Sequence, residues 1–584
     1  MEQPIFSIVI PAYNEEKYLP RCLEAVRRAE EQLGETVEII VANNVSTDRT
    51  AELAESAGAK VVLVEKRCIS TVKNEGALLD LGVNQSGFLG ARVTCTQPTR
   101  LFFTFDEILT DADADFKRLG CVNIVTYELQ PGKYTLESFE PYTLRYLKLL
   151  VLEGECTVEN VYLREYVNPD TFATFHAANA DLDTLFKAAV ETYRQNAVDV
   201  FMDCPHRERA GWLCDSYFTA RTAYTLGGAT TVEHNFIENF LLPDKFEHLP
   251  EGMLPMCYPA DHYDGVFIPN WALWFVVQLE EYLDRSQDRA TVDALQPKLR
   301  ALFAYFAKFE NGDGLLEKLE SWVFVEWSKA NEFVQDVNYP SNMLYAAALA
   351  AAGRLYYDEA LTQKAEAIRE TIRKQSFDGD FFVDNALRTA DGKLEVTKNR
   401  SEVCQYFAFY FGTATPKTHA ELWRVLRDEF GPDRKETKAH PAVHPANAFV
   451  GNVLRLELLA REGLVQQLLD EAVDYNLYMA NLTGTLWEND GAYASCNHGF
   501  ASHVAHLLLR DVLGIQHVDA ATKRISIRFA DLDLPSCEGS ALTPNGPVSL
   551  SWKREGDTIR YTVNVPEGYT TNVTSADGIK AEAD

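Results

Sequence analysis

The chain has 584 residues, of which 46% are hydrophobic and 11% aromatic, so most of it can bury the cores of several domains. It contains 86 acidic and 55 basic residues, which gives a formal net charge of −31. Because so acidic a surface repels phosphate backbones and anionic lipid heads, the charge argues against nucleic acid and membranes as partners. A neutral sugar is compatible with it.

Residues 1–76 alternate between strand and helix patterns. Apolar runs rich in Ile and Val at 6–10, 37–41 and 61–64 are typical of strands. Between them, 15–33 and 49–58 have the spacing of amphipathic helices. This alternation predicts a small parallel α/β unit over 1–76.

The N-terminus does not resemble a secretory signal. The stretch MEQPIFSIVIPAYNEE has no basic segment ahead of its apolar run, and Pro11 interrupts that run. No segment of the sequence reaches the ~18 consecutive apolar residues of a membrane span. We therefore expect a cytoplasmic protein.

Three further regions follow in chain order. Over 77–168 the helical period is lost, and short apolar or alternating runs predict an antiparallel β-sandwich, with strands at 101–105, 122–129, 145–152 and 160–166. Over 169–515 helical spacing returns, for example at 292–306 and 344–355, and the length suggests a helical toroid. Over 516–584 alternation predicts a C-terminal β domain, with a hairpin of 548–552 and 558–565 around a five-residue loop.

The most informative stretch is DCPHRERAGWLCD at 203–215. Asp203 can cap a helix that Pro205 opens, which would place Glu208, Trp212 and Asp215 on one face. This combination is typical of a carbohydrate site. Carboxylates accept hydrogen bonds from sugar hydroxyls, and an indole stacks on the apolar face of a sugar ring. The alternative is a solvated acidic helix start whose charge Arg207 and Arg209 neutralise.

A second acidic motif lies near the end of the helical region. GTLWEN at 484–489 joins Trp487 to Glu488, and Asn497 and His498 follow in the same loop region. Glu488 could activate water and His498 could bind sugar hydroxyls; the alternative is a surface glutamate and a buried, hydrogen-bonded histidine. The sequence has no HExxH or zinc-finger spacing, so we expect no metal and no cofactor.

Aromatic and acidic residues also gather between the two motifs. Trp271 follows Ile268, Pro269 and Asn270, and Trp327 closes the segment that begins at Trp322. Each cluster alone is more often core than site. Together with the motifs they supply the rings and carboxylates that a sugar-binding cleft needs.

Residues 77–584 resemble glycoside hydrolase family 78, the inverting α-L-rhamnosidases. The similarity rests on DCPHRERAGWLCD, on FEPYTLRYLKLL at 139–150 and on TLWEND…NHGFASH at 485–503, in that order. It implies an (α/α)6 barrel at 169–515 flanked by β domains, with Glu208 as general acid and Glu488 as general base, ~6.5–9.5 Å apart. The substrate would be a small neutral rhamnosylated glycoside or oligosaccharide. The resemblance and the aromatic clusters together give the expected sugar-binding residues: Asp203, Arg207, Trp212, Asp215, Trp271, Trp327, Trp487 and His498.

Residues 1–76 resemble the start of a family-2 glycosyltransferase, which implies a truncated GT-A-like unit. The similarity lies in IPAYNEEKYLPRCLEA, IIVANNVSTDRTAELA and KNEGA. Asn43 stands where such proteins usually have a uridine-binding Asp, and the chain leaves the pattern before the metal-binding D-x-D. This departure argues against transferase chemistry.

Four functions therefore compete. The first is hydrolysis of terminal α-L-rhamnosides. The second is another (α/α)6-barrel glycosidase or a lyase, although the usual anionic substrates of lyases fit poorly with the acidic composition. The third is a non-catalytic carbohydrate-binding protein, which would bind sugar without turnover. The fourth is a transferase built on 1–76, which would have to bind a nucleotide diphosphate.

Overall fold

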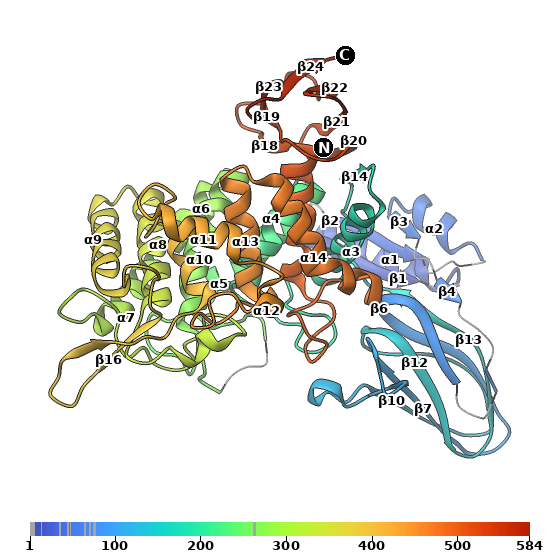
Figure 1. Cartoon of the computed structure of the whole chain (residues 1–584). Helices are drawn as coiled ribbons and strands as arrows, with labels where there is room; N and C mark the ends of the chain where they lie inside the picture. The colour runs from blue at the N-terminus through green and yellow to red at the C-terminus, as the bar shows by residue number, and fades with distance from the viewer. Residues whose placement is uncertain are drawn as a thin grey trace. The chain divides into compact units, whose positions relative to one another are not determined.

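The computed structural model describes residues 6–12, 15–33, 37–43, 46, 48–63, 66–68, 72–73, 77–260 and 264–584. It divides the chain into two compact units, Met1–Tyr166 and Val167–Asp584, and each is described by itself (Figure 1). Among the described helices, none is long and apolar enough to cross a membrane.

The first unit begins with the predicted parallel α/β arrangement. Strands β1 (Phe6–Ala12), β2 (Val37–Asn43) and β3 (Lys60–Leu63) form a parallel sheet in that order. Helices α1 (Leu19–Leu33) and α2 (Thr50–Ser56) connect them. The apolar face of α1 buries Leu19 and Leu23 in a small core with Ile39 and Val41 of β2. The predicted alternation of strands and helices is confirmed.

An antiparallel sheet fills the rest of the first unit. Its long strand β6 (Ala77–Cys95) pairs along its first part with β12 (Tyr142–Glu153) and along its second part with β11 (Gly132–Glu137) and β13 (Cys156–Glu165). Strand β7 (Thr99–Asp106) lies between β12 and β10 (Ile124–Leu129). Alternate residues of all these strands except β11 bury one common core, which includes Phe103 and Val158. The sheet therefore folds over itself as a sandwich, and the short strands β4 (Lys66–Cys68) and β5 (Val72–Lys73) extend it beside β13.

The second unit consists mainly of paired helices. Six helical segments are almost fully buried, as judged over the described residues: α4 (Asp215–Gly227), α6 (Pro269–Ser286), α8 (Tyr339–Leu355), α10 (Glu402–Tyr410), α13 (Val453–Arg461) and 499–513, which includes α15 (His503–Leu507). They alternate along the chain with half-buried helices: α3 (Ala180–Asn196), α5 (Thr231–Leu241), α7 (Arg289–Phe306), α9 (Glu359–Ser376), α11 (Ala420–Glu429) and α14 (Val465–Thr483). This is the expected (α/α)6 barrel.

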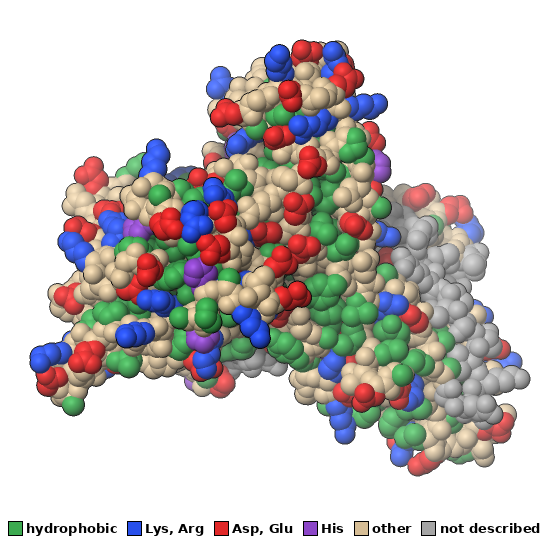
Figure 2. Space-filling view, in the orientation of Figure 1, with side chains coloured by type: hydrophobic (Ala, Val, Ile, Leu, Met, Phe, Trp, Pro, Cys, Tyr) green, Lys and Arg blue, Asp and Glu red, His purple; other side chains and the backbone are tan. Residues whose placement is uncertain are grey.

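Helix composition decides whether a helix lies in the inner or in the outer layer of the barrel. Helix α8 is apolar on every side and rich in alanine, so neighbouring helices can pack closely around it. Helix α9, its partner in the next position, buries only the stripe that includes Ala365, Ile368 and Ile372. A helix without a polar face must lie at the centre, whereas a striped helix can face solvent. The outer surface is accordingly mixed in charge, with acidic and basic side chains interspersed on the visible face (Figure 2).

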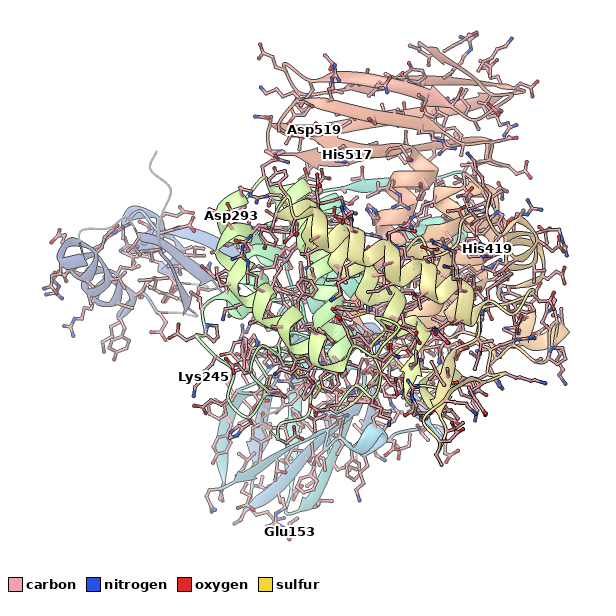
Figure 3. All side chains as sticks on the ribbon, turned by 90° about the vertical axis from the view of Figure 1, so that its left-hand side faces the viewer. Glu153, Lys245, Asp293, His419, His517 and Asp519 are labelled. Carbon is pink, nitrogen blue, oxygen red and sulfur yellow. The ribbon has the colours of Figure 1, made fainter. Side chains whose placement is uncertain are left out.

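The second unit ends in two packed sheets. Strands β20 (Ser536–Thr543), β21 (Gly546–Glu555), β22 (Thr558–Asn564) and β24 (Lys580–Ala583) form one sheet; β18 (Ile515–Asp519), β19 (Arg524–Phe529) and β23 (Thr570–Ser575) form the other. Strand β18 carries the labelled His517 and Asp519 (Figure 3). The predicted hairpin exists, but its loop is shorter than expected, since Glu555 pairs with Thr558 and leaves only Gly556 and Asp557 between the strands.

The C-terminal sheets are tied to the helices. Strand β14 (Thr174–Ala177), which precedes α3, joins the larger sheet by pairing with β20 near the other end of the chain. The indole N–H of Trp552 donates to the carbonyl of Leu513 at 3.1 Å. These contacts fix the C-terminal β domain to the helical part of the same unit.

Candidate active site

A cavity of about 520 Å³ opens in the helical unit. All but one of the expected site residues line it: Asp203, Arg207, Glu208, Trp212, Asp215, Trp271, Trp327, Glu488 and His498. Its size is in the range of small-molecule sites, and its walls combine aromatic and aliphatic side chains with convergent polar and charged groups. Residues nearly 300 positions apart in the chain thus share one hollow.

Trp487 is the exception. Its side chain is buried, and its indole N–H donates to Thr483 Oγ1 at 2.8 Å. Its ring packs edge-on against Tyr478, with ring centroids 5.6 Å apart. Trp487 therefore anchors the loop that presents Glu488 from behind, and the structure does not place it among the residues that line the cavity.

The stretch 203–214 is a loop, so the prediction of a helix opened by Pro205 is wrong. Asp203 closes this loop twice, because its N–H donates to the carbonyl of Ala210 and its Oδ1 accepts the N–H of Ala210, both at 3.1 Å. Helix α4 begins only at Asp215. Glu208 and Asp215 reach the same cavity because the loop folds back, and not because they share a helix face.

Gly211 lies in this loop beside the backbone of Tyr258. The N–H of Tyr258 donates to the carbonyl of Gly211 at 2.9 Å, so the two backbones run side by side. A Cβ at position 211 would lie 2.4 Å from the carbonyl oxygen of Tyr258. Glycine at this position permits a close backbone approach that any side chain would prevent.

Strain is stored immediately before α4. Cys214 has φ 73° and ψ −55°, the conformation of a rare and strained γ-turn. The side chain of this residue is fully buried. Strained non-glycine residues of this kind gather at functional sites, where the surrounding packing holds them.

The strain at position 214 can be measured. Cys214→Gly and Cys214→Ala both remove the buried thiol, but only glycine adopts a positive φ without a steric penalty. We expect the glycine variant to be more stable than the alanine variant by about 1 kcal/mol. Urea unfolding of the two variants measures the difference, and equal stability would show that position 214 is not strained.

Glu208 and Glu488 converge on one guanidinium group. Arg207 Nη2 lies 2.9 Å from Glu208 Oε1 and 3.5 Å from Glu488 Oε2. These two oxygens are therefore at most about 6.4 Å apart, which is just below the range of ~6.5–9.5 Å expected for an inverting pair. Glu208 is partly exposed to the cavity, whereas Glu488 is buried at its wall. The two carboxylates, one from each sequence motif, line the same cavity.

Glu488 is fixed by donors from three segments. Trp327 Nε1–H donates to Oε1 at 2.9 Å, while Oε2 accepts the N–H of Ser495 at 3.3 Å and the long contact from Arg207. Its own N–H donates to the carbonyl of Ser495 at 3.0 Å. Both oxygens are thus held in one orientation, which suits a carboxylate that must position a water molecule.

A buried pair joins the two motifs behind the carboxylates. His498 Nε2 lies 2.8 Å from Asp215 Oδ1, and the N–H of Gly499 donates to the carbonyl of Asp203 at 2.7 Å. Burial alone would lower the pKa of His498, but the hydrogen bond to Asp215 and the charge of Glu488 raise it to about 9. His498 is therefore a cation at neutral pH and balances the surrounding carboxylates.

The buried carboxyl group of Asp203 is expected to make the stability of the folded protein depend on pH. Burial and the charge of Glu208 raise the pKa of Asp203 to about 8. The pKa of Asp203 in the folded protein thus lies above its value of about 3.9 in the unfolded chain. The stability that protonated Asp203 contributes is therefore fully present below pH ~4, and it is lost as the pH rises toward 8. Asp203→Asn should remove this loss, so thermal unfolding between pH 5 and 9 should vary less than in the wild type. The exposed Asp380→Asn is the control, and parallel curves for Asp203→Asn and the wild type would contradict the assignment.

Asp203, Cys204 and His498 are the candidate metal ligands in this cavity, since their donor atoms lie within 4.8 Å of one another. However, the thiol of Cys204 donates to Asp203 Oδ2 at 2.7 Å. Burial and the neighbouring carboxylates raise the pKa of Cys204 well above its usual value. A metal ligand must be a thiolate, so a metal ion bound by this set would have to displace the proton that Cys204 donates to Asp203.

Aromatic rings form the remaining walls. Phe324 packs edge-on against Trp271 and Trp327, with centroid distances of 5.0 and 4.8 Å, and Phe449 lies 6.0 Å from Trp271. The sequence predictions did not single out several lining residues: Met256, Asp264, Val266, Phe324, Phe449, Tyr493 and Ala494. Most of them are apolar residues in irregular loops, where neither periodicity nor a charged motif marks them.

Comparison with protein families gives three matches. Residues 170–512 match the bacterial alpha-L-rhamnosidase 6 hairpin glycosidase domain, and residues 514–583 match the bacterial alpha-L-rhamnosidase C-terminal domain. Residues 7–77 match glycosyl transferase family 2. A 4,4'-diaponeurosporenoate glycosyltransferase of Staphylococcus haemolyticus is 33% identical over 141 residues, which are 24% of this chain and 32% of that protein.

Curated relatives and solved structures agree with the longer match. Alpha-L-rhamnosidases of Alteromonas sp. (strain LOR) and Formosa agariphila are 20% and 21% identical over 85% and 88% of this chain, and 55% and 56% of their own lengths. The chain therefore spans about half the length of these relatives. Crystal structures of a GH78 rhamnosidase of Bacillus sp. GL1 and of the Streptomyces avermitilis alpha-L-rhamnosidase complexed with L-rhamnose share the fold. They have TM-scores of 0.78 and 0.66, identities of 21% and 17%, and cover 87% of this chain and 54% and 50% of theirs.

Proposed function

Because the chain belongs to the bacterial α-L-rhamnosidase six-hairpin glycosidase family, we propose that it hydrolyses terminal α-L-rhamnosides. The observation that carries the proposal is the convergence of Glu208 and Glu488 on Arg207 in one cavity with tryptophan walls. A pair of carboxylates that flank a sugar is the usual equipment of a glycoside hydrolase.

The two carboxylates have different surroundings and would have different roles. Glu208, partly exposed at the tip of its loop, would protonate the glycosidic oxygen as the bond to the aglycone breaks. Glu488, whose two oxygens are fixed by Trp327, Arg207 and Ser495, would take a proton from the water that attacks the anomeric carbon from the opposite face. The product would then have the inverted configuration.

The remaining polar groups would bind the sugar. Asp203 and the Asp215–His498 pair reach the cavity from its floor, where they can exchange hydrogen bonds with ring hydroxyls. Trp212 and Trp271 offer indole faces for the apolar side of the ring, including the methyl group that distinguishes rhamnose from most hexoses. This set suits a neutral, partly apolar sugar.

The test is the first sugar released from an aryl α-L-rhamnoside, observed by proton NMR before it mutarotates. We expect β-L-rhamnose, with no turnover of aryl α-D-glucoside or aryl β-D-galactoside under the same conditions. Initial release of α-L-rhamnose would contradict the role of Glu488 as a base. Absence of turnover of every aryl α-L-rhamnoside would end the proposed function.

A further inference from the structure

A third glutamate lies behind the cavity wall and does not line it. Glu326 is fully buried, and its Oε2 accepts the N–H of Gly451 at 3.0 Å and the N–H of Asn447 at 3.3 Å. No arginine, lysine or histidine forms an ion pair with it among the described residues. Burial raises the pKa of Glu326 to about 8, although the hydrogen bonds that it accepts lower it, so it is mainly a neutral carboxyl group at pH 7.

The turn that Glu326 binds is strained. Val450, between the two donors, has φ 65° and ψ −64°, which is the same rare γ-turn conformation as that of Cys214. A β-branched residue with positive φ is an outlier that persists only when its surroundings enforce it. The two backbone N–H groups that bracket Val450 both donate to the carboxyl group of Glu326.

The fit between the carboxyl group and the turn is close. A Cβ at Gly451 would lie 2.6 Å from Glu326 Oε2 and 2.7 Å from the Cβ of Ala446. Position 451 therefore has no room for a side chain between these two residues. The carboxyl group and the turn are complementary in shape as well as in hydrogen bonding.

The residues next to Val450 and to Glu326 in the chain, Phe449 and Trp327, both line the cavity. Phe449, the residue before Val450, forms part of the cavity wall and packs edge-on against His498 with centroids 6.0 Å apart. Trp327, the residue after Glu326, donates to Glu488, and Asn447 Nδ2–H donates to the carbonyl of Trp327 at 2.6 Å. The turn and the tryptophan that orients Glu488 are thus joined through Glu326 and Asn447.

We propose that Glu326 is a positioning residue that enforces the strained turn 447–451 and thereby fixes Phe449, Trp327 and Glu488 in their working geometry. The expected effect of Glu326 on catalysis rests on the proposed function, whereas its expected effect on the turn does not. Glu326 touches no substrate and acts through the residues on either side of it. Its carboxyl group works by shape and by accepting hydrogen bonds, so its negative charge is not required.

Kinetics on an aryl α-L-rhamnoside test the catalytic consequence. We expect Glu326→Ala to lower kcat about 10- to 100-fold, with a smaller change in KM, because a displaced Glu488 fails mainly in the transition state. Glu326→Gln, a neutral group of the same shape, should restore kcat to within a few-fold of the wild type.

A matched control separates positioning from lost stability. Asp384 is also fully buried, and its carboxyl group accepts hydrogen bonds from the N–H and the hydroxyl of Ser401, which does not line the cavity. Asp384→Ala should destabilise the protein and leave kcat unchanged. An unchanged kcat in Glu326→Ala, or an equal loss of kcat in Glu326→Ala and Glu326→Gln, would overturn the proposal.

A thermal double-mutant cycle tests the structural part without any substrate. Val450→Gly and Val450→Ala both empty the same buried space, but only glycine accepts the positive φ without strain. With Glu326 present, Val450→Gly should therefore unfold at a higher temperature than Val450→Ala. With Glu326→Ala the turn is released, and this difference should disappear; a difference that persists would show that Glu326 does not enforce the turn. Because the unfolding temperature is independent of turnover, it distinguishes a failure of the proposed role of Glu326 in the turn from a failure of the proposed hydrolase activity.

Discussion

Glu208→Gln and Glu488→Gln are each expected to lower kcat/KM for an alkyl α-L-rhamnoside about 10²- to 10⁴-fold, because each removes one proton-transfer group. Glutamine preserves the size of the side chain, and at position 208 its amide oxygen can still accept a hydrogen bond from Arg207. At position 488 the amide NH2 replaces one of two accepting oxygens, so either Trp327 or the pair Ser495 and Arg207 loses its acceptor. The loss should therefore appear mainly in kcat, with a smaller change in thermal stability for Glu208→Gln than for Glu488→Gln. Steady-state kinetics and a melting curve for each variant measure both quantities.

The leaving group distinguishes the two roles. An aglycone that leaves easily needs no protonation, so Glu208→Gln should retain much of its activity on nitrophenyl rhamnosides and little on alkyl rhamnosides. Glu488→Gln should be impaired equally on both, because the water still lacks a base. Glu421→Gln, on the exposed face of α11, is the control and should behave as the wild type. An opposite pattern for the two variants would exchange the roles of acid and base.

Arg221→Met is expected to reduce the free energy of unfolding by about 3–5 kcal/mol, the typical cost of removing one partner from a buried ion pair. Arg221 Nε donates to Glu281 at 2.8 Å and its Nη1 donates to Glu457 at 2.9 Å. Without the guanidinium, the partly buried Glu281 and the buried Glu457 each lose a counter-charge. Urea unfolding at pH 7 measures the loss.

The same variant has a predictable pH dependence. Burial alone would raise the pKa of Glu281, but the charges of Arg221 and Arg285 lower it to about 2. The stability that this ion pair contributes is therefore fully present above the unfolded pKa of about 4.3 and is lost as the pH falls toward 2. The deficit of Arg221→Met relative to the wild type should be largest near pH 7 and smaller at pH 3.

An exposed pair serves as the control. Arg424 and Glu421 form an ion pair on α11 in which both side chains are largely solvated. Arg424→Met should change the free energy of unfolding by less than about 1 kcal/mol. A similar loss for Arg221→Met would show that the buried network contributes no more than a surface pair.

Local patterns were sufficient where a segment's environment repeats along the chain. The alternation of strands and helices in 6–63 and the stripe of α7 are visible because each buried face recurs every two or 3.6 residues. Strand β6 lay outside the predicted strands, since its burial pattern changes where it passes from one part of the sheet to the other. Strand β14 is too short to be marked by any period, and its partner lies at the other end of the chain.

The loop at 203–214 shows why the helix prediction failed. Pro205 and the spacing of Glu208, Trp212 and Asp215 agree with a helix. However, the backbone of Gly211 pairs with that of Tyr258, and the N–H of Ala210 donates to Asp203. These long-range and side-chain hydrogen bonds replace the helical ones, and the chain accepts a strained Cys214 to enter α4.

The sequence by itself determined the domain types, the acidic motifs and most of the residues that line the cavity, because residue types suited to sugar chemistry stand together in short segments. Only the tertiary structure decided how those segments meet: that one arginine bridges Glu208 and Glu488, that Trp487 lies behind the wall, and that Glu326 binds the turn of Val450. The reason is physical. A residue's chemistry is local, whereas its distance, burial and strain depend on partners more than a hundred positions away in the chain.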